Sequence, residues 1–233
     1  MRRSAALLLA AALAAAVTAC GGGEAAGGEG AATLWVTRDR GATVLYDEQV
    51  PAGQTVLQAL DRVADVETRY GGRFVQSVDG LEGSLAEGRD WFFFVNGIAG
   101  DRSAAEYRLR PGEHAWWDYH GWADEPEVKV VVGAFPEPFV HGFDGRVREA
   151  VVLYDDGAEA VLARRLARIV GGRAVRGAAP VDANVLAVVG PRETMRATTA
   201  GAAGAPVRFE VGARAAAALA RDPSRYARRF AVP

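Results

Sequence analysis

The sequence predicts an α+β fold of two small domains, with a mixed sheet around one helix in the first domain and a small α/β arrangement in the second. Three observations support this prediction. Extended and helical patterns alternate along the chain after residue 32. Half of the 233 residues are hydrophobic and 24% are charged, which is ordinary for a globular protein. Four of the five tryptophans lie between Trp91 and Trp122, in two aromatic runs that are typical of strands.

The N-terminal 32 residues are expected to lie outside the fold. Arg2 and Arg3 precede an uncharged run over residues 5–17 that is too short for a standard membrane-spanning helix, so residues 1–19 are predicted to be a signal peptide. A bulky apolar residue and two small ones precede Cys20, the only cysteine, and this tetrad resembles the bacterial lipobox. The resemblance implies cleavage before Cys20 and lipidation of its thiol; an ordinary secretory signal is the alternative. The glycine-rich residues 20–32 then predict a flexible tether.

A domain boundary is expected near residues 124–127, which gives domains over residues 33–124 and 125–233. From Cys20 to Glu125 the chain has 9 basic and 18 acidic residues, and from Pro126 to Pro233 it has 16 and 11, so the net charge changes from −9 to +5. Attraction between the two halves and a basic face toward anionic lipid are both consistent with this asymmetry. The whole-chain net charge of −2 does not favour nucleic-acid binding.

The first domain is predicted to contain two strands, a helix and then further strands. Thr55 is the expected N-cap of the helix, because apolar residues follow it at helical spacing. Asn96-Gly97 predicts a tight turn after an aromatic strand. The expected strands and extended segments are residues 33–37, 43–47, 66–70, 74–78, 91–95, 107–109 and 115–119. This order is that of the β-grasp fold, in which a mixed sheet wraps one helix.

Several motifs in residues 33–122 resemble the C-terminal domain of transcobalamin and intrinsic factor, which is also found in many bacterial surface lipoproteins. They are residues 50–60 at the junction of strand and helix, Gly80, Trp91, Val95-Asn96-Gly97, residues 104–109, Pro111-Gly112-Glu113 and Trp117-Asp118-Tyr119. The resemblance implies a ligand-binding module and makes cobalamin one candidate ligand. No other cofactor is expected. The helical domain that encloses most of the corrinoid in transcobalamin has no counterpart in this sequence.

The second domain is predicted to be a small α/β domain, and its sequence resembles no family that we recognise. Residues 159–170 form the clearest helical pattern, and a second helix is expected after Pro191 and a third over residues 214–221. The nearly all-apolar residues 184–190 predict a central, buried strand. The other expected strands are residues 128–133, 149–154 and 207–211.

The aromatic runs supply the candidate ligand-binding residues. Both faces of the strand over residues 91–95 are apolar, so it is either buried on both sides or exposes one face as an aromatic platform. An exposed aromatic patch marks a ligand or partner site. Four residues are expected to form this platform, namely Trp116, Tyr119, His120 and Trp122. Trp91 and Asn96 complete the candidate set.

Metal binding, catalysis and nucleic-acid binding have little support in the sequence. The three histidines, His114, His120 and His141, match no zinc spacing, so no metal site is expected. Ser103 could be combined with His120 and Asp118 as a triad, but no nucleophile-elbow motif is present, so the chain is not expected to be an enzyme. The arginines of the second domain are not interleaved with aromatic residues, so nucleic acid is not an expected partner.

The sequence therefore predicts a binding lipoprotein, anchored by its lipid to the extracytoplasmic face of the bacterial cell membrane. It would capture a small molecule through aromatic contacts and hand it to a transporter. The alternative is a non-catalytic module for protein–protein contact in the cell envelope.

Overall fold

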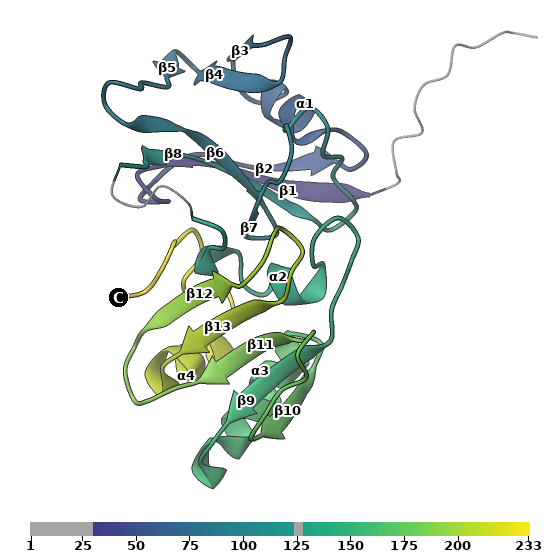
Figure 1. The fold of residues 1–233 in the computed structure, drawn as a ribbon, viewed down its shortest axis with the longest axis vertical. Coiled ribbons are helices and arrows are strands. Elements are labelled where there is room, and N and C mark those ends of the chain that lie inside the picture. The colour runs from purple at the N-terminus through teal and green to yellow at the C-terminus, as the bar shows by residue number, and fades with distance from the viewer. Residues whose placement is uncertain (1–29, 124–127) are drawn as a thin grey trace, which may run out of the picture.

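The computed structural model describes residues 30–123 and 128–233 and confirms the α+β class. Residues 31–121 form an N-terminal unit with a five-stranded and a three-stranded sheet, and residues 128–233 form a C-terminal unit with a second five-stranded sheet (Figure 1). The predicted signal peptide, Cys20 and residues 20–29 of the predicted tether lie outside the described residues, as does the predicted boundary at residues 124–127. Within the part of the chain that the structure describes, no helix is long and apolar enough to cross a membrane.

The five-stranded sheet of the N-terminal unit is mixed, as predicted, with the order β2-β1-β8-β6-β7. Its central strand β8 runs parallel to β1 and antiparallel to β6. The strands are β1 (Ala31–Arg38), β2 (Thr43–Pro51), β6 (Arg89–Val95), β7 (Ile98–Ala99) and β8 (His114–Gly121). The predicted tether is two residues too long, because Ala31 and Ala32 already pair with β2 and Ala32 is buried.

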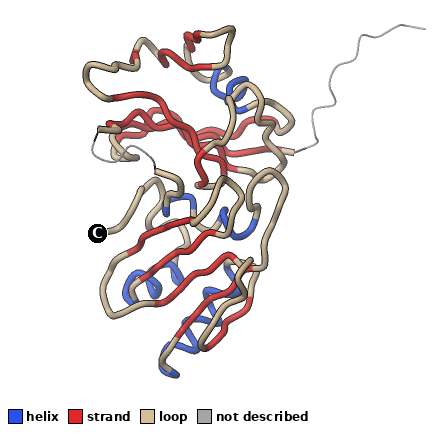
Figure 2. Tube along the Cα trace, viewed as in Figure 1, coloured by secondary structure: helices blue, strands red, loops and turns tan. Residues whose placement is uncertain are grey.

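One face of this sheet is covered by a helix and a small second sheet (Figure 2). Helix α1 (Val56–Asp61) begins at Thr55, which was predicted, and Thr55 and Gln58 form a capping box. The small sheet consists of β3 (Val66–Arg69), β4 (Phe74–Val78) and β5 (Leu81–Glu82). Side chains of α1 and β4 share one hydrophobic core with Trp117 and Tyr119 of β8. Of the seven Phe, Trp and Tyr residues of β6 and β8, three belong to this core, namely Trp91, Trp117 and Tyr119.

The C-terminal unit is built on a sheet of order β10-β9-β11-β13-β12, in which only β12 is antiparallel. Helices α3 (Ala160–Ile169) and α4 (Ala213–Arg221) contact each other and lie on the same side of the sheet (Figure 1). The strands are β9 (Ala150–Tyr154), β10 (Arg173–Arg176), β11 (Asn184–Val188), β12 (Met195–Thr199) and β13 (Val207–Val211). The prediction of a central, fully buried strand at β11 is confirmed.

Two predicted elements of the C-terminal unit are wrong. Residues 128–133 do not form a strand: Val130 makes a single bridge with Ile98, and the chain then enters a 3-10 turn, η1 (Val132–Ala134), followed by the short helix α2 (Glu137–Val140). The apolar part of this run, residues 130–133, is buried, and Val131 packs against Phe94 and Trp116 of the N-terminal unit. The helix expected after Pro191 is instead strand β12, whose residues alternate along the edge of β13.

Candidate functional site

A cavity of about 340 Å³ lies along the outer edge of β6. Strand β7 pairs with only Phe94 and Val95, so among the described strands the preceding part of β6 has no neighbour on this side. Phe92 and Phe93 point to opposite faces of the sheet, and both rings stay half-buried at the cavity. The remaining wall is formed by Phe74, Asp90, Trp91, Phe94, Ala99, Gly100, His120 and Val128.

His120 supplies a polar group to this aromatic wall. Its ring stacks on Phe92 with 4.5 Å between ring centroids and an interplanar angle of 27°. Its Nδ1 lies 2.9 Å from Oδ1 of Asp118. When Nδ1 donates to the carboxylate, Nε2 of a neutral imidazole is a hydrogen-bond acceptor.

Asp118 is fully buried, and four donors surround its carboxylate. The backbone N–H groups of Arg40 and Gly41 donate to it over 3.1 and 2.8 Å, and the Thr37 hydroxyl and His120 make the other two contacts. The indole Nε1 of Trp116 in turn donates to Thr37 Oγ1 over 2.7 Å. This network fixes the orientation of His120, because a buried carboxylate with four partners holds its neighbours in one arrangement.

Asp90 is the second ionisable group of the cavity wall. Burial raises the pKa of its carboxyl group, and the backbone N–H of Trp91, which donates to Oδ1 over 2.8 Å, opposes that shift. Gly83 lies directly against this carboxylate, and a side chain at position 83 would displace it. The cavity therefore combines aromatic rings with one imidazole and one carboxyl group.

The predicted aromatic platform is wrong as an exposed surface. Trp116, Tyr119 and His120 are at most 5% exposed. Trp116 and His120 point to the face of the sheet that Phe230 of the C-terminal segment covers, with 5.3 and 5.0 Å between ring centroids. Tyr119 points to the other face, where it packs on Trp91 and its hydroxyl donates to Glu82 O over 2.9 Å. Both faces of the strand are covered, so no side of it presents a platform.

The other three candidates are not brought together either. Trp91 is buried and lines the cavity, and its indole Nε1 donates to Leu81 O over 2.8 Å. Trp122 is half-buried and does not belong to the cavity wall. Asn96 is fully buried in the predicted turn, where its side chain donates to Gly142 O over 3.0 Å. Only Trp91 and His120 of the six candidates border the cavity, whereas its exposed and half-buried rings are Phe74, Phe92 and Phe93, which were not chosen.

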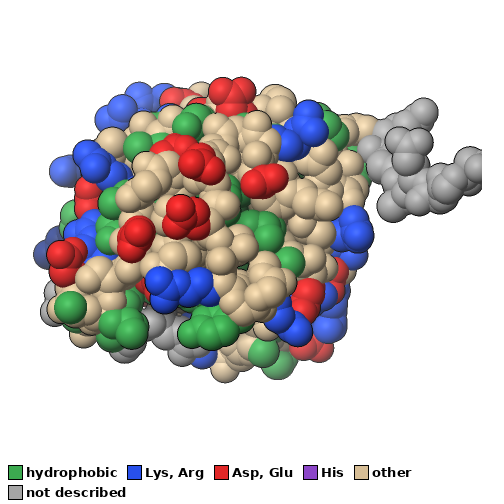
Figure 3. Space-filling view, turned by 90° about the horizontal axis from the view of Figure 1, so that it is seen from above, with side chains coloured by type: hydrophobic (Ala, Val, Ile, Leu, Met, Phe, Trp, Pro, Cys, Tyr) green, Lys and Arg blue, Asp and Glu red, His purple; other side chains and the backbone are tan. Residues whose placement is uncertain are grey.

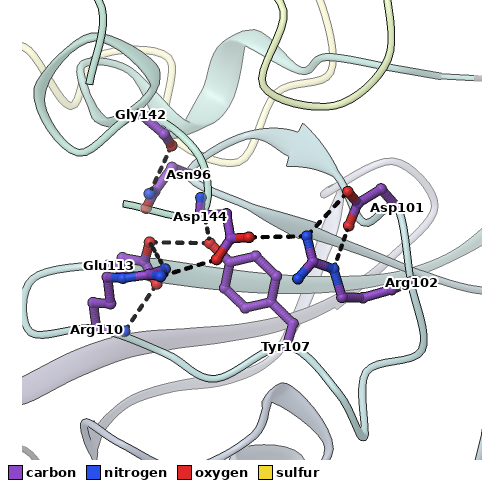
Figure 4. Close-up of polar contacts among 8 residues, drawn as sticks. All are labelled: Asn96, Asp101, Arg102, Tyr107, Arg110, Glu113, Gly142 and Asp144. Atoms are coloured by element: carbon purple, nitrogen blue, oxygen red, sulfur yellow. Dashed lines mark hydrogen bonds and ion pairs between the residues drawn. The ribbon is translucent and has the colours of Figure 1, made fainter. Parts of the chain in front are cut away.

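A polar cluster joins the two units on another side of the sheet (Figure 4). Asp144 of the C-terminal unit accepts hydrogen bonds from Arg110 over 2.9 Å and from Arg102 over 3.0 Å, and Arg110 is the main reason that its pKa is lowered. The backbone N–H of Asp144 donates to the Tyr107 hydroxyl, which donates to Glu113. Burial raises the pKa of Glu113. We call these five residues the interdomain polar cluster, and they are a structural connection rather than a pocket.

Two further arrangements from the sequence can be placed. The hydroxyl of Ser103 donates to Arg73 O over 2.8 Å, so it does not join His120 and Asp118 as a catalytic triad. In residues 30–123 and 128–233, no group of three histidine, cysteine, aspartate or glutamate side chains is arranged to hold a metal ion. The cavity at β6 is lined mainly by aromatic and other apolar side chains.

Comparison with known proteins gives one family match. Residues 53–121 match a family described as a domain of unknown function, DUF4430. The match lies within residues 33–122, whose motifs resemble the transcobalamin C-terminal domain. No curated protein matches the chain.

Several solved structures are similar to part of the chain, among them haptocorrin and a bacterial protein. The crystal structure of haptocorrin in complex with Cbi is 18% identical, with 39% of this chain and 24% of haptocorrin covered and a TM-score of 0.34. A "putative metal binding protein" from Ruminococcus gnavus is 17% identical, with 39% of this chain and 96% of that chain covered and a TM-score of 0.33. The chain thus spans about a quarter of the length of haptocorrin.

Proposed function

We propose that the chain is an extracytoplasmic binding lipoprotein whose N-terminal unit captures a small molecule in the cavity at β6. The observation that supports this most directly is the pair of half-buried rings, Phe92 and Phe93, on a cavity of about 340 Å³. Ligand pockets typically enclose about 300–1,000 Å³ and have apolar walls with a few polar groups. The cavity is at the small end of that range and has this composition.

Binding would depend on apolar burial and ring stacking, and the polar groups of the cavity wall would set the orientation of the ligand. An apolar ligand would cross the open edge of β6 and contact Phe92 on one face of the sheet and Phe93 on the other, removing part of their remaining surface from water. Nε2 of His120 would accept a hydrogen bond from a donor on the ligand, since Asp118 holds Nδ1. Neither step requires bond making or breaking, so the proposed function is not enzymatic.

The size of the cavity limits the ligand class. A whole corrin ring with its substituents is far larger than about 340 Å³, so a corrinoid would enter by one edge and leave most of its surface uncovered. A compact ligand with one or two rings and a hydrogen-bond donor would fill the cavity. Corrinoids therefore remain one candidate among flat ligands.

Tryptophan fluorescence tests the ligand-binding proposal, because Trp91 lines the cavity. The chain from Gly21 onward would be titrated with a corrinoid, with haem and with small aromatic amines. We expect saturable quenching by at least one of them, and its loss in a Phe92→Ala/Phe93→Ala variant. Tyr154→Ala, which removes a half-buried ring from the C-terminal unit, is the matched control and should bind normally. Quenching that persists in the double variant, or no quenching by any probe, would contradict the proposal.

We also propose that a lipid on Cys20 holds the protein at the membrane, where a captured ligand could pass to a transporter. The support is the lipobox-like tetrad and the absence of a second cysteine in the sequence. Two or more acyl chains give stable membrane attachment where one does not. A Cys20→Ser variant expressed in a bacterial host is expected in the soluble fraction or as unprocessed precursor. A mature, membrane-bound Cys20→Ser protein would refute the lipid anchor.

The protein–protein alternative is favoured by a different part of the molecule. Strand β2 is an edge strand, and Val44 and Leu45 on it are 44% and 37% exposed. At an edge strand with exposed apolar side chains, a strand of another protein can pair and extend the sheet. A Val44→Lys/Leu45→Lys variant that loses a co-purifying envelope protein, in a chain that quenches with no small molecule, would support this alternative.

A further inference from the structure

The outward surfaces of α3 and α4 carry a group of arginines on one side of the C-terminal unit. The two helices contact each other and lie on the same side of the sheet (Figure 1). Six exposed arginines of these helices and the turn after α4 make up what we call the arginine surface: Arg164, Arg165, Arg168, Arg214, Arg221 and Arg225. Their side chains are on the helix positions that do not face the core.

None of these six arginines forms an ion pair with a carboxylate among the described residues. Other exposed arginines of the same unit do: Arg173 pairs with Glu149 and Arg208 pairs with Glu210. Basic residues in the last turn of a helix interact favourably with the helix dipole. This interaction gives a structural reason for the positive charge at Arg168 and Arg221, but not at the other four positions. Of the remaining four, Arg225 lies beside Tyr226 and Asp222, whereas Arg164, Arg165 and Arg214 make no ion pair with a carboxylate in the described part of the chain.

The shape of the surface also favours a broad, flat partner. A shallow groove of about 570 Å³ runs along α4 between Arg214, Arg221 and Arg225, with the small Ala217 and Ala218 in its floor. On α3, Val161 is 71% exposed one turn before Arg164 and Arg165. Small and apolar side chains between arginines allow a partner to approach the helices closely.

Two carboxylates, Glu193 and Asp222, also line the groove beside its three arginines, so the groove itself has a net charge of 3 − 2 = +1. Oε1 of Glu193 accepts a hydrogen bond from the Tyr226 hydroxyl over 2.8 Å. The Asp222 carboxylate accepts from the backbone N–H and the hydroxyl of Ser224. The end of the molecule that carries α1 and β3–β5 is different, since acidic side chains gather in the middle of that face (Figure 3). The charge of the molecule is therefore unevenly distributed, with a basic helix surface on the C-terminal unit.

We propose that the arginine surface docks on an anionic lipid bilayer. The inference rests on the proposed lipid anchor, which would keep the C-terminal unit close to lipid headgroups. Arginines near an anionic leaflet each strengthen attachment through the surface potential, and the effect adds over several residues. Helices α3 and α4 contain no aromatic residue. A single-stranded nucleic acid could therefore bind their arginines through its phosphates but could not stack its bases on them, which favours lipid as the partner. The two helices would lie flat on the headgroups, with the cavity at β6 held away from them by the N-terminal unit.

Vesicle co-sedimentation tests this proposal on the chain from Gly21 to Pro233, which holds every described residue. We expect binding to vesicles of phosphatidylglycerol and phosphatidylcholine that weakens with salt, and no binding to phosphatidylcholine alone. An Arg165→Gln/Arg168→Gln/Arg214→Gln variant should bind the anionic vesicles roughly 100-fold more weakly. Glutamine keeps the helix propensity, so the fold should be retained.

The matched control removes the same charge from other exposed positions, as Arg62→Gln/Arg69→Gln/Arg146→Gln. It should bind anionic vesicles nearly as well as the unaltered chain. An equal loss in both variants, the absence of vesicle binding, or retention by an acidic protein but not by vesicles would overturn the proposal. Because this chain has no lipid, the result is independent of the Cys20→Ser fractionation and of the fluorescence titration.

Discussion

Single buried polar residues determine how the aromatic strands are arranged. Asp118 is an example, because its carboxylate lies between β1 and β8 with no exposed surface and with four donors around it. A buried charge is tolerated only when such donors replace water. The same four contacts orient His120, so one residue connects the packing of the sheet to the wall of the cavity.

Replacing Asp118 with alanine should therefore destabilise the protein severely. The change removes the acceptor of two part-buried backbone N–H groups and the closer of the two acceptors of the Thr37 hydroxyl, and losing these hydrogen bonds together costs roughly 3–5 kcal/mol. The free energy of unfolding in urea would measure this. Asp155→Ala, at an exposed position, should change it by less than about 0.5 kcal/mol. A loss below about 1 kcal/mol at Asp118 would show that the network is not structural.

His114 should make the stability depend on pH. Burial lowers its pKa from 6.5 to about 3, and its Nε2 has no hydrogen-bond partner within residues 30–123 and 128–233. Between these two pH values the unfolded chain binds a proton that the folded protein does not, so stability falls as the pH is lowered, by about 1.4 kcal/mol per pH unit. Urea unfolding at several pH values would show this slope.

The His114→Leu variant isolates the contribution of this histidine. Asp90 and Glu113 have raised pKa values and change stability in the opposite sense, but they are common to both proteins. The difference between the two curves should therefore grow below pH 6.5 and level off near pH 3. Parallel curves over this interval would contradict the assigned role of His114.

At the scale of elements, the features that depend only on neighbouring residues were predicted correctly from the sequence. The Thr55 cap, the Asn96-Gly97 turn and the helix over residues 159–170 are each specified by neighbouring residues, and all three are present. The strand predicted for residues 128–133 was wrong because an apolar run indicates that a segment is buried but does not specify its secondary structure. The exposure of Trp116 could not be predicted for a related reason, since residue Phe230, far along the chain, covers it.

The cap of α1 gives the element-scale prediction. Thr55 accepts a hydrogen bond from the backbone N–H of Gln58 over 3.1 Å, and the Gln58 side chain accepts one from the backbone N–H of Thr55 over 2.9 Å. Thr55→Ala should lower the free energy of unfolding by about 1 kcal/mol. Thr198→Ala, at an exposed position on edge strand β12, is the control and should cost less. Equal losses at both positions would argue against a specific capping effect.

At the scale of the whole molecule, the C-terminal segment returns to the N-terminal unit and closes its second face. The Arg228 guanidinium forms an ion pair with Asp47 over 2.7 Å. It also lies over the ring of Trp35, 4.9 Å from the ring centroid. Gly41, with φ of +80°, lies so close to the backbone of Arg228 that a side chain at position 41 would collide with it. Together with the interdomain polar cluster, these contacts connect the two units at two separate places.

Phe230 is the residue through which this closure can be tested. Its ring lies 5.5, 5.3 and 5.0 Å from those of Phe94, Trp116 and His120. Phe230→Ala should lower the free energy of unfolding by about 2 kcal/mol, less than for a fully buried ring, because Phe230 is half-buried. It should also shift tryptophan emission to longer wavelength as water reaches Trp116. Val181→Ala, at a position 94% exposed, should change neither quantity. If Phe230→Ala leaves both the emission and the stability unchanged, the C-terminal segment does not seal this face of the sheet in solution, and Trp116 and His120 would then be open to a partner.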